Sequence, residues 1–216
     1  MPQTTPTPPP ARCGQALFEQ MLQGWGGQGD FWVFAYASLI WRPEGTPLET
    51  RPARVYGYHR ALHMWSRVNR GTPECPGLVF ALLPGGSCTG VVQRISGADG
   101  LNYLHRLWAR EMPNPVYDPC WLPARTSQGT VRALAFTLSR CSPNHTGHLS
   151  DSDYRHIFRH AVGRYGSTLD YARQTHEQLA ALGIHDQALA RLLACAAPDV
   201  APPFPKQLHS NPAPRP

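Results

Sequence analysis

Glu111 places a carboxylate on the apolar stripe of a helix that the sequence predicts over residues 101–112. It follows Trp108 by three positions and Leu107 by four, so at helical spacing it shares their face. Partial burial and the negative end of the helix dipole both raise the pKa of such a carboxylate. Glu111 is therefore a candidate base near neutral pH. The apolar positions of the stripe are Leu101, Leu104, Leu107, Trp108 and Met112.

A second interpretation of Glu111 stays open at this point. A glutamate that ends a helix is common, and it can bend outward or pair with an arginine such as Arg110. The spacing predicts that Arg106 and Arg110 lie towards the side of the helix opposite the apolar stripe.

Residues 31–41, FWVFAYASLIW, could supply a second kind of chemistry. The first half is a short apolar and aromatic run, which is typical of a buried strand. From Tyr36 to Ser38 the run changes to small residues, and these let a ligand come close to the backbone. Successive N–H groups at the end of a strand suit a carboxylate or an oxyanion. A plain core strand followed by a turn is the alternative, and composition alone favours it.

Several segments resemble, in the same order, the ChaC-type γ-glutamylcyclotransferases, a family that acts on glutathione. The family's first motif reads Gly-Tyr-Gly-Ser-Leu-Ile-Trp, so Ala35 and Ala37 stand here in place of two glycines. The resemblance runs from about residue 31 to residue 193. The segments that carry it are residues 32–43 (WVFAYASLIWRP), 70–77 (RGTPECPG), 103–111 (YLHRLWARE), 165–171 (YGSTLDY) and 183–186 (GIHD).

The resemblance implies an enzyme that cleaves glutathione to 5-oxoproline and Cys-Gly, with Glu111 as the proton acceptor. It implies that backbone N–H groups of one loop hold the substrate carboxylate and the developing oxyanion, and that neither a metal nor an organic cofactor takes part. Two alternatives stay open: the same cyclisation on another γ-glutamyl amine or dipeptide, and an inactive relative that binds γ-glutamyl ligands or a protein partner. The substrate-binding residues are expected to be Ala35, Tyr36, Ala37, Ser38, Leu39 and Ile40.

Two departures from the family pattern bear on the substrate. If the family glycines need a positive φ, Ala35 and Ala37 add strain of roughly 1–2 kcal/mol each; if they only allow close approach, two methyl groups narrow the pocket. We expect ordinary β-region dihedrals and an active enzyme. His145 stands where family members often have a tyrosine, which leaves the preferred substrate open.

Composition narrows the class of protein. The 216 residues suit one domain with tails, and the net charge of +6 comes mostly from single, scattered arginines. That pattern favours a solvated surface over nucleic-acid binding, and its mild positive field would attract a small anionic substrate. The N-terminus lacks the apolar core of a secretory signal and no long apolar span occurs, so we expect a cytoplasmic protein with no transmembrane helix. The six cysteines form no Cys-x-x-Cys pair and are expected to be reduced.

Histidine and cysteine clusters offer weaker hypotheses. No set supplies four metal ligands at a recognised spacing, so surface histidines are the favoured interpretation. Cys120 has no neighbouring histidine motif that would activate it, so we expect a buried, inert thiol. The residues considered as ligands are Cys141, His145 and His148, and His156 with His160.

The order of predicted elements, strands first and helices last, indicates an α+β fold. We expect a mostly antiparallel, partly closed β-barrel or sheet with flanking helices, the γ-glutamylcyclotransferase-like fold. The domain is predicted at residues 14–197, between disordered proline-rich tails at 1–13 and 198–216. The predicted elements are a helix at 16–25, a strand at 55–65, hairpins turning at 84–87 and 127–129, a helix at 101–112, and three C-terminal helices. The first of these three is capped by Asp151 and has an apolar face that runs from Tyr154 to Tyr165. The second runs from a cap at Ser167 to Leu182, and the last covers about 187–196.

Overall fold

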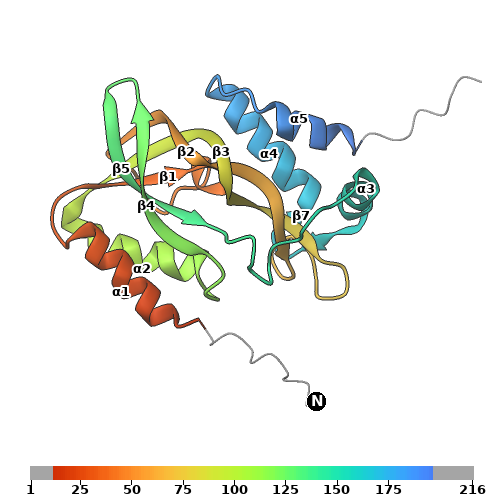
Figure 1. Cartoon of the computed structure of the whole chain (residues 1–216), viewed down its shortest axis with the longest axis horizontal. Coiled ribbons are helices and arrows are strands. Elements are labelled where there is room, and N and C mark those ends of the chain that lie inside the picture. The colour runs from red at the N-terminus through yellow and green to blue at the C-terminus, as the bar shows by residue number, and fades with distance from the viewer. Residues whose placement is uncertain (1–11, 197–216) are drawn as a thin grey trace, which may run out of the picture.

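A five-stranded closed barrel forms the centre of the molecule, in a computed structural model that describes residues 12–196. The strand order is β1-β3-β2-β4-β5, and a parallel pairing of β1 with β5 closes the barrel (Figure 1). All longer pairings are antiparallel, which confirms the predicted α+β class. The strands are β1 (Phe31–Ala35), β2 (Glu49–Ser66), β3 (Gly77–Ile95), β4 (Asp118–Thr126) and β5 (Gly129–Thr137).

The turn predicted at residues 84–87 is wrong, because β3 runs through it without a break. β3 pairs with β2 along its whole length, from Glu49 opposite Arg94 to Ser66 opposite Gly77. Gly85 and Gly86 have φ angles of 102° and 72°, and the register shifts beside them. Glycines in this left-handed region can form a bulge that bends a strand as well as a turn. The other predicted turn is confirmed, since β4 and β5 form a hairpin there.

Helices cover the barrel from two sides (Figure 1). α1 (Gly14–Trp25) and α2 (Gly100–Glu111) pack on one side, where Phe18, Met21, Leu104 and Leu107 join a core with β1 and β5. The C-terminal helices enclose a second core on the other side. They are α3 (Asp151–His160), α4 (Thr168–Ala181) and α5 (Gln187–Ala194).

The first C-terminal helix, predicted to extend to Tyr165, ends earlier than expected. α3 stops at His160, and a short hairpin of β6 (Val162–Gly163) and β7 (Gly166–Ser167) follows. Tyr165 was assigned to the buried face of the helix, but it is 49% exposed, because its N–H donates to the carbonyl of Asn69 instead of continuing the helix. The N–H groups of Arg164 and Tyr165 therefore donate to carbonyls of the segment that follows β2, and not to carbonyls of a longer α3.

Helix starts are set by short polar side chains. Ser150, rather than the expected Asp151, caps α3, and it forms a capping box with Asp153. Ser167 caps α4 by accepting from the N–H of Asp170, as the sequence predicts. Asp186 caps α5 by accepting from the N–H of Leu189 at 2.9 Å.

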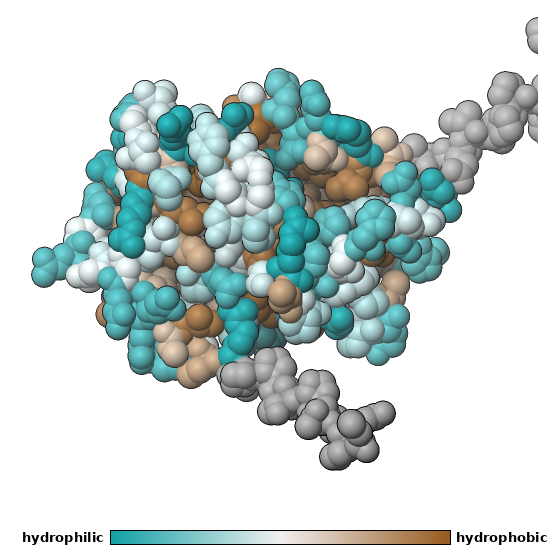
Figure 2. All heavy atoms as spheres, in the orientation of Figure 1, coloured by the Kyte–Doolittle hydropathy of each residue, from teal (hydrophilic) through white to brown (hydrophobic). Residues whose placement is uncertain are grey.

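The surface shows no single dominant apolar face in the view of Figure 2, where hydrophilic and hydrophobic residues alternate. Among the helices that the structure describes, none is both long and apolar enough to span a bilayer. The predicted tails lie outside the described residues, except for Arg12 and Cys13. Arg12, which precedes α1, donates to the carbonyl of Tyr117 at 2.8 Å.

Candidate active site

The chain after β1 turns into a short 3₁₀ helix, η1 (Ser38–Ile40). Ala37 caps this turn with φ −146° and ψ −125°, so its φ is negative but its ψ lies outside the β region that we expected. The N–H of Ile40 donates to the carbonyl of Ala37 at 2.8 Å, and the N–H of Arg42 donates to the carbonyl of Ser38 at 2.9 Å. The side-chain amide of Gln93 also donates to the carbonyl of Leu39 at 2.9 Å, so backbone and side-chain bonds together hold the loop.

Within η1, the N–H groups of Ser38 and Leu39 have no acceptor in the described part of the chain. The N–H of Ile40 is occupied, and Ala35 lies inside β1 opposite Val91. Of the loop predicted to bind substrate, the first turn of η1 is therefore the part that can donate to a carboxylate or an oxyanion.

A small pocket joins this loop to the end of α2. Its volume is about 30 Å³, room for about one water molecule. The structure brings four of the six predicted loop residues together with Glu111 here, while Ala35 and Ile40 do not line the pocket. The lining residues are Tyr36, Ala37, Ser38, Leu39, Phe80, Glu111, Tyr117, Phe136 and Tyr171.

The side chain of Glu111 is 18% exposed and points into the pocket from the last residue of α2. Burial raises the pKa of Glu111, and the negative charge of Glu44 raises it further. Arg110 acts in the opposite direction, because its Nε lies 3.1 Å from the Glu111 carboxylate, but the net shift of the pKa is upward. Both interpretations from the sequence thus apply: Glu111 pairs with Arg110 and still faces the interior.

The spacing of α2 predicts Arg110 on the side opposite the apolar stripe, but its guanidinium reaches the η1 loop and Glu111 instead. Its guanidinium donates to the carbonyl of Arg42 at 2.5 Å and to the hydroxyl of Ser38 at 3.3 Å. Glu44 lies 3.8 Å away. The arginine side chain is long enough to fold back over the helix end, so it fastens the η1 loop to the helix that carries Glu111.

Three buried tyrosines surround the carboxylate, and sequence analysis found only one of them as a pocket residue. The hydroxyl of Tyr36 donates to the carbonyl of Phe136 at 2.9 Å. The hydroxyl of Tyr117 donates to the carbonyl of Phe80 at 3.4 Å, and that of Tyr171 accepts from the N–H of Phe80 at 3.4 Å.

Burial is the main cause that raises the pKa of each tyrosine in this group, and the nearby Glu111 carboxylate raises it further. The phenols therefore stay neutral beside the carboxylate. Tyr171 is the last residue of a segment that carries the family resemblance, so the sequence did contain a signal that could have marked it as a pocket residue. Tyr117 lies between α2 and β4, and no pattern in the sequence marks it.

Comparison with known proteins identifies the family. The family model described as "ChaC-like protein" matches residues 31–198. This chain belongs to the ChaC-like family. It is 32% identical over 182 residues to the glutathione-specific gamma-glutamylcyclotransferase of Escherichia coli (strain K12), covering 82% of this chain and 78% of that protein. It is 26% identical over 195 residues to glutathione-specific gamma-glutamylcyclotransferase 1 of Homo sapiens, covering 87% and 88%.

A solved structure shares the ChaC-like fold. The crystal structure of the gamma-glutamyl cyclotransferase specific to glutathione from yeast superposes with a TM-score of 0.71 at 20% sequence identity, over 78% of this chain and 96% of that one. This likeness confirms the predicted γ-glutamylcyclotransferase-like fold.

The two alanines of this ChaC-like chain both have negative φ, since every described residue with positive φ is a glycine. Ala35 is fully buried within β1, and Ala37 is 7% exposed and packs in the core on the α3–α5 side. The backbone at these two positions therefore does not need the positive φ that would require glycine. Ala35 and Ala37 carry no strain from such a φ.

His145 lies apart from the pocket of this ChaC-like site. It forms a bridge with Met64 on β2, and its ring stacks 5.8 Å from the ring of His63. Within residues 12–196, no group of three or more His, Cys, Asp or Glu side chains could hold a metal ion. The rings of His156 and His160 lie 4.7 Å apart on α3. The Cys120 thiol lies 3.6 Å from the hydroxyl of Thr137.

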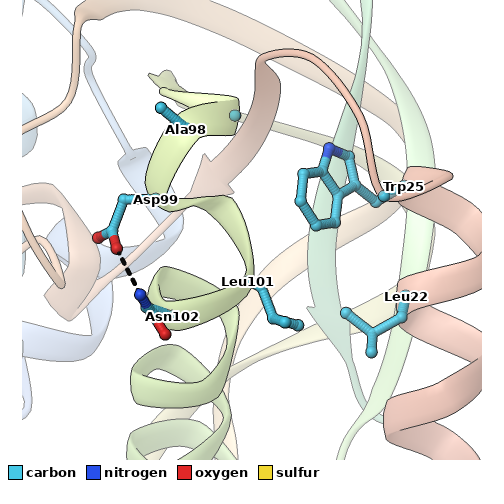
Figure 3. Close-up of a pocket in the computed structure, with 8 residues that line it drawn as sticks. Leu22, Trp25, Ala98, Asp99, Leu101 and Asn102 are labelled. Atoms are coloured by element: carbon cyan, nitrogen blue, oxygen red, sulfur yellow. Dashed lines mark hydrogen bonds between the residues drawn. The ribbon is translucent and has the colours of Figure 1, made fainter.

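A larger cavity of about 280 Å³ lies at the other end of α2 (Figure 3). Leu22 and Trp25 from α1 face Leu101, and the side chain of Asn102 donates to Asp99 at 2.9 Å. Leu101 was assigned to the buried stripe but is 48% exposed, because only part of the first turn of α2 is covered by α1. The helix rise puts this cavity roughly 17 Å from Glu111, so the two are separate.

Proposed function

We propose that this chain is a glutathione-specific γ-glutamylcyclotransferase that releases 5-oxoproline and Cys-Gly. The observation that carries the proposal is the meeting of Glu111 with the N–H groups of Ser38 and Leu39 in one tyrosine-lined pocket. The names of the E. coli and human relatives point to the same substrate.

The reaction is an intramolecular attack. The α-amino nitrogen of the γ-glutamyl unit bonds to its own γ-carbonyl carbon, and the amide bond to cysteine breaks. Because nucleophile and electrophile are tethered, closing the five-membered ring costs little entropy. The ammonium group has to lose one proton to become a nucleophile and a second as the lactam nitrogen forms, and the leaving nitrogen has to gain one proton to depart as an amine. The protein also has to stabilise the charge that develops on the carbonyl oxygen.

Glu111 suits these proton transfers. Its raised pKa brings the carboxylate closer to the working pH, which improves a general base, and the protonated acid can then supply the leaving nitrogen. The N–H groups of Ser38 and Leu39 supply fixed dipoles for the substrate carboxylate or the oxyanion. Tyr36, Tyr117 and Tyr171 keep water away from the carboxylate and offer neutral hydroxyls around it.

The pocket is smaller than a glutamyl group, so binding must move side chains outward. Arg110 joins the loop to α2 through Ser38 and Arg42, so an outward shift of the loop would change these two hydrogen bonds. We assign the activity to a domain over residues 14–197, with a small γ-glutamyl compound as the partner.

The test is to incubate the purified protein with glutathione and measure 5-oxoproline and Cys-Gly in equal amounts. The same assay, run in parallel with a set of γ-glutamyl dipeptides and amines, tests whether one of these compounds is the preferred substrate. Release of 5-oxoproline from those compounds but not from glutathione would replace the substrate in the proposal. Binding without release from any of them would favour the inactive relative.

A further inference from the structure

Three arginines gather around Tyr165, on the hairpin between β6 and β7. The guanidinium carbon of Arg42 lies 5.7 Å from the centre of the Tyr165 ring, and that of Arg164 lies 5.4 Å from it. Arg70 donates a hydrogen bond to the carbonyl of Tyr165, and its guanidinium lies 4.8 Å from the Tyr171 ring. The group Arg42, Arg70 and Arg164 is called the arginine cluster below.

The cluster is built from segments that are distant in sequence. The hairpin is fixed to the segment after β2 by two backbone bonds: the N–H of Arg164 donates to the carbonyl of Val68, and that of Tyr165 donates to the carbonyl of Asn69. Arg42 comes from the chain that follows η1. The fold thus brings together three cations that no single element would place side by side.

No carboxylate pairs with the cluster. Within the described residues, none of the three guanidinium groups lies within 4.0 Å of an acidic side chain. Asp170 acts on Arg70 only at longer range, and its carboxylate accepts from the hydroxyl of Ser167 at 2.7 Å. Like charges that converge without a counter-ion repel, and the repulsion is relieved when an anion binds between them.

The cluster adjoins the candidate active site. The Arg70 guanidinium lies 4.8 Å from the centre of the Tyr171 ring, and Tyr171 lines the pocket together with Glu111. Trp41, the neighbour of Arg42, lies 6.0 Å from the same ring. The carbonyl of Arg42 accepts from Arg110, the partner of Glu111. Tyr171 thus links the pocket of the proton-transfer group to Arg70 of the cluster.

We propose that the arginine cluster binds the C-terminal carboxylate of the tripeptide substrate, on the glycine residue. This inference rests on the proposed function, because it assumes that the scissile amide sits at Glu111. Two residues follow that amide, and an extended dipeptide spans at most about 7 Å. We expect that length to bring the carboxylate past Tyr171 to the cluster. The cluster then selects γ-glutamyl tripeptides over γ-glutamyl amines, which lack the distant anion.

Steady-state kinetics with two substrates test the assignment. Glutathione is compared with its glycine amide, which keeps every atom near the reaction but has no distal charge. We expect the ratio of kcat/KM for glutathione to kcat/KM for the amide to be at least about ten in the wild type, since hydrogen bonds to charged groups are worth about 1.5–3 kcal/mol. The difference should appear mainly in KM.

Arg164→Gln and Arg42→Gln should each move this ratio towards one, since both side chains are exposed and their replacement leaves the core intact. Arg173→Gln is the matched control, an exposed arginine on α4 outside the cluster, and it should leave the ratio unchanged. A wild-type ratio near one, or a ratio that the cluster variants do not change, would overturn the assignment.

Calorimetry separates this inference from the proposed function. If glutathione gives no 5-oxoproline, the proposed function fails, but binding of glutathione and of the amide can still be measured. At least tenfold tighter binding of the acid, lost in Arg164→Gln, supports the carboxylate site on its own. Equal binding of the two compounds, or no binding of either, refutes it.

Discussion

Replacing Asp186 tests whether a buried ion pair holds the C-terminal helices against the barrel. Asp186 lies 2.7 Å from Arg60, and their side chains are only 17% and 4% exposed. Arg60 also donates to the carbonyl of Tyr36 at 2.7 Å and to that of Thr89 at 3.2 Å. One guanidinium thus links β2, β3, the end of β1 and the start of α5.

Asp186→Ala removes the partner of a buried cation, which costs about 3–5 kcal/mol. It also removes the cap of α5, which is worth about 1 kcal/mol. Asp186→Asn keeps an oxygen that can cap the helix and accept from Arg60, so it should cost about 1.5–3 kcal/mol. Ser150→Ala is the control, because it removes a helix cap at an exposed site with no ion pair and should cost about 1 kcal/mol.

Urea unfolding measures these differences, provided that the slope of unfolding free energy against urea stays the same among the variants. We expect the order wild type, Ser150→Ala, Asp186→Asn, Asp186→Ala from most to least stable. If Asp186→Ala were no less stable than Ser150→Ala, the ion pair would contribute nothing and the reasoning would be refuted.

The same pair predicts a pH dependence. Burial opposes the charge on Asp186, but Arg60 and the N–H of Leu189 outweigh it and hold the pKa of Asp186 below its ordinary value. A depressed folded-state pKa stabilises the protein at pH values above the unfolded-state pKa, about 3.9. The stability is lost as the pH falls through the folded-state pKa. The gap between the wild type and Asp186→Asn should therefore narrow below about pH 4.

Two further predictions concern the pocket. Arg110→Met removes the charge that lowers the pKa of Glu111, so the acidic limb of the kcat/KM profile should move to higher pH; an unmoved limb would show that Arg110 does not act on the base. Restoring glycine at Ala35 and Ala37 should change kcat/KM by less than about tenfold, or 1.4 kcal/mol, because neither position has a positive φ. A far larger gain in kcat/KM would show that the methyl groups obstruct the site.

Much of the fold followed from local patterns. The periodicity of α2 placed Glu111 on its inner face, and the turn chemistry of residues 127–129 fixed the β4–β5 hairpin. The turn predicted at Gly85 and Gly86 was wrong because glycine permits a bulge as readily as a turn, and only pairing with the partner strand decides between them.

The rest of the candidate site depends on contacts between distant segments. Tyr117 follows Glu111 by six residues and Tyr171 follows it by sixty, and no spacing within one element reports that the three meet in one pocket. The predicted position of Arg110 was wrong because helical spacing fixes the direction of the Cα–Cβ bond but not the position of the guanidinium at the end of a long side chain. The arginine cluster exists only because the β6–β7 hairpin packs on the segment after β2.

The central claim is that Glu111 moves the protons in the cyclisation of glutathione. Glu111→Gln keeps the shape of the side chain and removes its basicity, so folding should be retained, as measured by circular dichroism and urea unfolding. Single-turnover release of 5-oxoproline from saturating glutathione should then fall by about two orders of magnitude or more, the scale of general-base catalysis. A folded Glu111→Gln variant that releases 5-oxoproline at nearly the wild-type rate would contradict the account.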